Sequence, residues 1–65
     1  MLYHVHMVTK EGRPAVLKSI TTPERAMEAV STVLRDGTVI DAWVDDDEGK
    51  KYADLAAIKK HCGIR

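Results

Sequence analysis

The segment from Thr21 to Gly37 constrains the fold most, because its two ends and its interior all indicate one helix. Thr21 or Thr22 can cap the first turn through its hydroxyl, and Glu24 stands three residues after Thr21, as a capping box requires. Pro23 falls in the first turn, where its missing N–H costs nothing. Gly37 can take the left-handed conformation that ends a helix. The sequence therefore predicts a single helix between these ends.

Apolar residues inside this segment recur at spacings of three and four, which places them on one side of a helix. This stripe consists of Ala26, Met27, Val30, Val33 and Leu34. A helix with one apolar side needs a sheet or another helix to cover it, so the flanking segments are expected to supply a sheet.

Three further stretches have the composition of strands. Residues 2–9 alternate between an apolar side and a side with two histidines, and residues 15–20 form a second strand whose inner and outer faces stay ambiguous. Residues 10–14 hold a glycine and a proline among charges and predict a hairpin turn. Residues 38–45 are rich in β-branched side chains and predict a third strand.

Alternation along the third strand predicts which of its side chains face the helix. The set facing the helix is Ile40, Ala42 and Val44. The set facing away is Val39, Asp41, Trp43 and Asp45. A turn around Gly49 leads to a brief fourth strand at residues 50–53, antiparallel to the third.

A second helix is predicted at residues 55–62, with Asp54 as its N-cap, Gly63 as its stop and Ile64 as the apolar contact that accompanies such a stop. Its apolar side consists of Leu55, Ile58 and Cys62. The order β-β-α-β-(β)-α predicts one small α+β domain over residues 1–65. Its sheet has three or four strands, antiparallel or mixed, with both helices packed on one face. The sequence does not determine the order of the strands in the sheet.

Composition limits the classes of function. Ten basic and ten acidic residues cancel, which argues against a protein whose main task is to bind nucleic acid. Phe is absent, so the core is aliphatic and small, which favours support from a second copy. The sequence has no signal-peptide pattern and no apolar run of about 20 residues, so a cytoplasmic location is expected.

His4 and His6 lie two apart on a strand and share a face, a spacing that can chelate a metal. The remaining candidate ligands, Asp41, His61 and Cys62, form no recognisable ligand spacing, so no metal site is predicted. Polar residues on a partly solvated face, with pH sensing as a lesser alternative, explain the two histidines.

The sequence shows no catalytic constellation, so neither an enzyme nor a cofactor is predicted. Cys62 is the only cysteine, which excludes an internal disulfide, and it is expected to be reduced and buried. The acidic run from Asp45 fails the calcium-loop pattern, because Gly49 is fifth and Ala56 twelfth, and it predicts a charged hairpin turn.

Trp43 is the most informative single residue, and three interpretations compete. It belongs to the core if the predicted register is wrong, it marks a protein-binding or self-association surface, or it is a stacking platform for nucleic acid. The third interpretation would use Lys18 and the pairs Lys50–Lys51 and Lys59–Lys60.

The favoured hypothesis is a small accessory or regulatory module that binds protein as a homodimer, formed through the sheet face without helices or through a sheet edge. The binding residues predicted for it are Trp43, Val39, His4 and His6. The alternative is a nucleic-acid-binding module that uses the same face. The arrangement of elements is typical of many unrelated small α+β domains, and a fold at that level does not identify a function.

Overall fold

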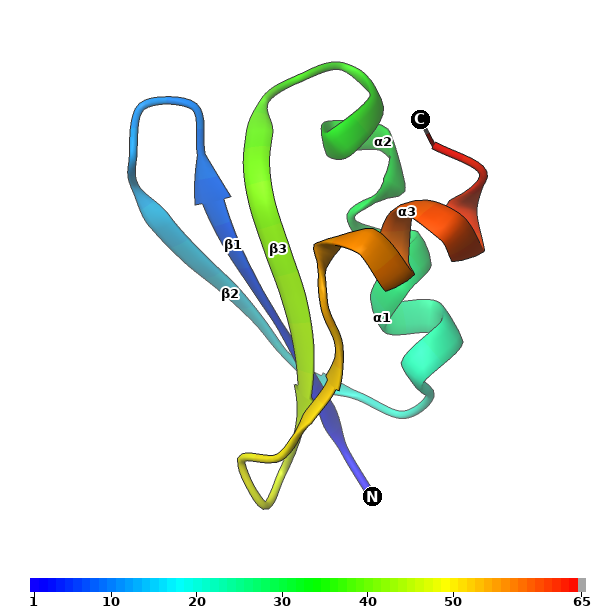
Figure 1. Ribbon diagram of the computed structural model, residues 1–65. Helices are drawn as coiled ribbons and strands as arrows, with labels where there is room; N and C mark the ends of the chain where they lie inside the picture. The colour runs from blue at the N-terminus through cyan, green and yellow to red at the C-terminus, as the bar shows by residue number, and fades with distance from the viewer. Residues whose placement is uncertain (65) are drawn as a thin grey trace.

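Four antiparallel strands and three helices make up residues 1–64, the part of the chain that the computed structural model describes. They are β1 (Tyr3–Thr9), β2 (Pro14–Ile20), α1 (Pro23–Ala29), α2 (Ser31–Arg35), β3 (Val39–Asp46), β4 (Lys51–Ala53) and α3 (Leu55–Cys62). The sheet order is β2-β1-β3-β4, and the helices gather on one side of it (Figure 1). This arrangement confirms the predicted α+β class, including the fourth strand antiparallel to the third.

The predicted single helix is wrong, because the chain forms two helices that meet at Val30. The Ser31 hydroxyl donates to the Glu28 carbonyl at 2.8 Å and so competes with the helical hydrogen bonds of the backbone. The N–H of Val30 reaches back only three residues, to the Met27 carbonyl at 3.3 Å. The sequence Ser-Thr-Val that follows consists of residues with low helix propensity, which makes the break inexpensive.

Thr22 is the N-cap of α1, since its Oγ1 accepts from the Arg25 N–H at 3.2 Å. The predicted capping box is therefore wrong, because Glu24 has the required spacing only from Thr21 and not from Thr22.

The predicted helix ends at the other three positions are confirmed. Asp54 caps α3 by accepting from the Ala57 N–H at 2.9 Å. Gly63 takes a left-handed φ of 70° at the end of α3, and Ile64 packs against the core there. Gly37 takes a φ of 81° directly after α2.

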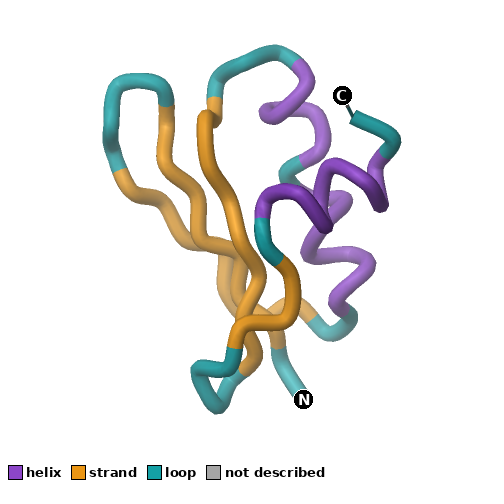
Figure 2. Tube along the Cα trace, viewed as in Figure 1, coloured by secondary structure: helices purple, strands orange, loops and turns teal. Residues whose placement is uncertain are grey.

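The core lies between the sheet and the helices, which form two layers in Figure 2. Its buried side chains are Val5, Ala26, Met27, Val30, Leu34, Val39, Ala42, Val44, Ala53 and Ile58. Val33, Leu55 and Cys62 are partly buried and pack against this cluster. The apolar sides predicted for both helical segments are therefore confirmed.

A β-bulge near the start of β3 reverses two predicted orientations. Val8 pairs with Asp41 while Thr9 pairs with Val39, so Ile40 is an extra residue without a partner on β1. Val39 consequently turns into the core with 6% of its surface exposed, and Ile40 is 59% exposed. The predictions that Val39 faces away from the helices and that Ile40 faces them are both wrong.

A second irregularity settles the faces of β2. Leu17 pairs with Val5, but Ile20 pairs with Tyr3, so one extra residue is accommodated between them. Ser19 takes a left-handed φ of 62° there, a conformation that costs free energy for a residue with a side chain. Because directly paired residues share a face, Leu17 and Ile20 belong to the side of the sheet with the helices.

Candidate functional site on the open face of the sheet

We call the side of the sheet opposite the helices the open face. Residues that are directly paired across antiparallel strands project from the same side, so the register defines its members. The helices and the core that they form with the sheet lie on the side opposite the open face. The open face carries His4, His6, Val8, Val16, Lys18, Asp41, Trp43 and Asp45.

Trp43 and His6 form a stacked pair on this face. They are direct cross-strand partners, their ring centroids are 5.3 Å apart, and the planes of the two rings differ by 7°. Trp43 is half-buried and does not belong to the core cluster, so the structure places it on the open face, as predicted. The stack places one face of the indole against the imidazole and leaves part of the Trp43 side chain exposed.

Asp45 holds the His6 ring from a second direction. Its Oδ2 lies 2.9 Å from Nε2 of His6, and the two side chains are 19% and 30% exposed. Oδ1 of Asp45 and Nδ1 of His4 are buried without a hydrogen-bond partner. Stacking and hydrogen bonding together fix the imidazole, so this part of the open face is ordered before anything binds to it.

A hollow of about 290 Å³ lies beside this cluster. Lys18 of β2 lines one side of it, and the acidic turn between β3 and β4 lines the other. Asp46 stabilises that turn, since its Oδ1 accepts from the backbone N–H groups of Glu48 and Lys50, each at 2.9 Å. The full lining consists of His4, His6, Val16, Lys18, Asp45, Asp46, Asp47 and Gly49. The open face therefore joins an aromatic surface to a hollow with charges of both signs.

The structure brings together three of the four predicted binding residues. Trp43, His4 and His6 share the open face, whereas Val39 lies in the core and is not available for contact. The contact between Asp45 and His6 was not predicted from the sequence. That contact depends on the register between β1 and β3, which the sequence left undetermined.

Two of the three other candidate metal ligands are not near the histidine pair. His61 and Cys62 belong to α3, on the opposite side of the sheet. Residues 1–64 contain no group of three or more His, Cys, Asp or Glu side chains arranged to hold a metal ion.

The lysines of the nucleic-acid alternative are also divided between the two sides. Lys59 and Lys60 lie on α3, so they cannot join a surface on the open face. Lys18 shares the open face with the carboxylates of Asp41 and Asp45, which repel phosphate. The mixed charges of the open face therefore suit contact with a protein better than contact with a nucleic acid.

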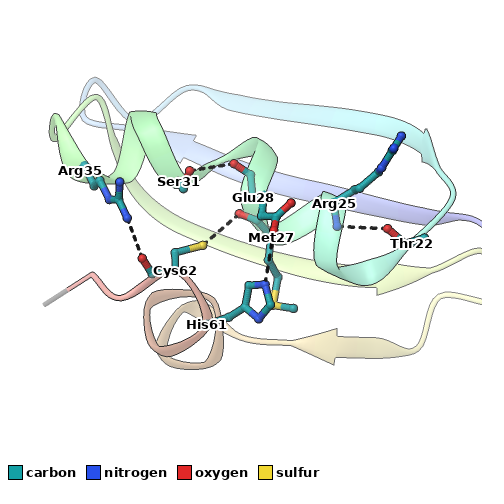
Figure 3. Close-up of polar contacts among 8 residues, drawn as sticks. All are labelled: Thr22, Arg25, Met27, Glu28, Ser31, Arg35, His61 and Cys62. Carbon is teal, nitrogen blue, oxygen red and sulfur yellow. Dashed lines mark hydrogen bonds and ion pairs between the residues drawn. The ribbon is translucent and has the colours of Figure 1, made fainter.

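A second hollow, of about 260 Å³, lies among the helices and is lined by Cys62 and four other residues whose polar contacts are drawn in Figure 3. The Cys62 thiol donates to the Met27 carbonyl at 3.6 Å, and Arg35 donates to the Cys62 carbonyl at 2.7 Å. His61 instead turns toward Glu28, with 4.0 Å between Nε2 and Oε1. Cys62 and His61 thus have separate partners, and these contacts fasten the end of α3 to α1 and α2.

Comparison with known proteins adds no relative. No protein-family model matches the chain, and neither curated proteins nor solved structures gave a significant match. None of the helices within residues 1–64 is long and apolar enough to cross a membrane. The functional assignment therefore depends on the geometry of the open face.

Proposed function

We propose that the chain is a small cytosolic accessory or regulatory module that binds protein and forms a homodimer through its open face. The observation that carries this proposal is the position of Trp43, half-buried on a face without helices and stacked on His6. Val16, the partner of His6 on β2, is 42% exposed. An ordered aromatic and aliphatic surface of this kind is typical of a contact site.

A second copy suits this face for two physical reasons. The formal net charge is zero, so two copies approach each other without long-range repulsion. The sheet has a packed layer on one side only, and a second sheet laid on the open face would complete a sandwich around the small core.

The size of the open face limits the strength of the dimer. Three strands about 4.8 Å apart, with seven residues of about 3.3 Å each, span roughly 15 by 23 Å. Such a face buries less than the roughly 1,200 Å² at which stable interfaces begin. We therefore expect a dissociation constant in the micromolar range, which suits a module that exchanges partners.

The test compares Trp43→Ala with Tyr52→Ala by sedimentation equilibrium. Trp43→Ala is expected to raise the dimer dissociation constant roughly 30-fold, the effect of losing a central aromatic contact. Tyr52 is a matched control, because it is an exposed aromatic, at 53%, that packs edge-on against Tyr3 beside the core. Its substitution is expected to leave the constant unchanged.

Circular dichroism of both variants separates binding from folding. The proposal requires that Trp43→Ala retains the secondary structure of the parent chain while losing affinity. A Trp43→Ala variant that unfolds would show that Trp43 supports the fold, and one that dimerises as tightly as the parent would place the interface elsewhere. Either result would overturn the proposal.

A further inference from the structure

Given the proposed dimer, we infer that its two-fold axis lies between the two open faces and runs parallel to β1. This axis brings Lys18 of each copy over the partner's Asp45. This inference rests on the proposed function and adds the orientation of the two copies. It follows from the order in which the strand register places charges on the open face.

The open face is a grid of three rows across β2, β1 and β3. The central row is Val16, His6 and Trp43, in which the outer two residues are the register partners of His6. The row on one side is His4 and Asp45, and Lys18 lies beside His4 where β2 is irregular and lines the same hollow. The row on the other side is Pro14, Val8 and Asp41. Strands β2 and β3 lie one strand spacing, about 4.8 Å, on either side of β1.

A two-fold axis along β1 keeps each row in register and exchanges β2 with β3 between the copies. Val16 then lies over the partner's Trp43, which covers the aromatic surface with an aliphatic side chain. Lys18 lies over the partner's Asp45, and symmetry repeats both contacts. The strands of the two sheets are nearly parallel, as in aligned sheet packing.

The other symmetric orientations about His6 bring like charges together. An axis perpendicular to the strands lays Asp45 over the partner's Asp41. An axis along one diagonal of the grid lays Lys18 over the partner's Lys18. The other diagonal lays Asp45 over the partner's Asp45, although it also lays Lys18 over the partner's Asp41. The axis along β1 is the one orientation of the four that pairs opposite charges without facing like charges, so we select it.

The hollow beside His4 gives the incoming lysine room. It opens between Lys18 and the β3–β4 turn, and Asp46 and Asp47 line it together with Asp45. One Oδ of Asp45 is already bonded to His6. The ammonium group of the incoming Lys18 therefore approaches Asp45 at the edge of an acidic hollow, where a charge contact does not require the His6–Asp45 bond to break.

Charge reversal tests this orientation. Lys18→Glu and Asp45→Lys each place like charges over one another in the homodimer, and each is expected to weaken self-association about tenfold or more. An equimolar mixture of the two variants restores both opposite-charge contacts in a heterodimer, whose affinity is expected to return near that of the parent chain. Lys60→Glu is the matched control, because it makes the same charge change on α3 and is expected to have no effect.

The outcomes distinguish the orientation from the dimer itself. If the parent chain dimerises but the mixture shows no rescue, the axis is wrong while the proposed function stands. If the parent chain stays monomeric at every concentration, the proposed function fails and this inference fails with it.

A neutral pair of variants covers the case in which Asp45→Lys does not fold. Asp45→Asn keeps an acceptor for His6 and removes the charge, and Lys18→Gln removes the opposite charge. If the two charges contact each other across the axis, the double variant weakens the dimer no more than either single variant does. Additive effects of the two substitutions would overturn the orientation.

Discussion

The two faces of the sheet carry different kinds of side chain. On the covered face, Val5, Ala42 and Val44 have no exposed surface, and the described residues include no buried polar or charged residue. On the open face, the register partners of the same strands are a histidine stacked on a tryptophan and a histidine opposite an aspartate. Both sets lie on β1 and β3, one residue apart along the chain.

The contrast separates what the fold requires from what it leaves free. Burial of aliphatic surface explains the positions of Val5, Ala42 and Val44 on the covered face, because each CH₂ removed from water contributes about 0.8 kcal/mol. It does not explain a half-buried tryptophan or the unpartnered polar atoms of His4 and Asp45. The proposed dimer would supply a contact for the half-buried tryptophan.

The largest effect is expected in the core between the covered face and the helices. Ile58→Ala removes a fully buried side chain of α3 that packs in this core, and it is expected to lower the free energy of unfolding by about 2 to 5 kcal/mol. Urea denaturation of the monomer measures this loss. Trp43→Ala, on the open face, is expected to cost less than half as much, and equal losses would erase the distinction between the two faces.

A smaller effect sharpens the comparison at the bulge of β3. Val39→Ala opens a buried site and is expected to cost about 1 to 2 kcal/mol, since two methyl groups lose their packing. Ile40→Ala, one residue away, changes an exposed side chain and is expected to stay within about 0.5 kcal/mol of the parent. The same urea titration tests both, and a larger loss for Ile40→Ala would show that the bulge is misplaced.

The smallest effect concerns Asp36, after α2. Hydrogen bonds from the Thr38 hydroxyl at 2.6 Å and the Thr38 backbone N–H at 2.9 Å, with a minor contribution from Lys10, hold the pKa of Asp36 below its usual value. A carboxyl whose pKa is lower in the folded chain stabilises it above the unfolded pKa. That stabilisation disappears as the pH falls through the folded value.

Asp36→Asn keeps an acceptor for Thr38 and removes the titration. When the pH is lowered from about 6 to about 2, the free energy of unfolding of the Asp36→Asn variant is therefore expected to fall less than that of the parent chain. Identical pH profiles of the two chains would contradict the assigned cause of the pKa shift.

The sequence predicted those parts of the fold that local signals determine. Asp54 and Gly63 bound the last helix as expected, and the stripe from Ala26 to Leu34 faces the sheet. The single helix between Thr21 and Gly37 was wrong, because a side-chain hydrogen bond from Ser31 outweighed a continuous apolar periodicity.

The candidate site was predictable in its members but not in its contacts. Alternation placed His4, His6 and Trp43 on one face, since a strand of period two needs no tertiary information. Val39 escaped that rule, because the bulge adds one residue and reverses the alternation beyond it. The His6–Asp45 bond and the position of Lys18 depend on strand order and register, which are set by tertiary packing.

The most direct test of the account is the molar mass of the reduced chain by light scattering over a concentration series, with Trp43 fluorescence recorded on the same samples. The mass is expected to rise from 7.2 kDa toward twice that value. Trp43 emission is expected to shift to the blue over the same concentrations, as the indole becomes covered. A constant monomer mass with unchanged emission would show that the open face does not bind a second copy.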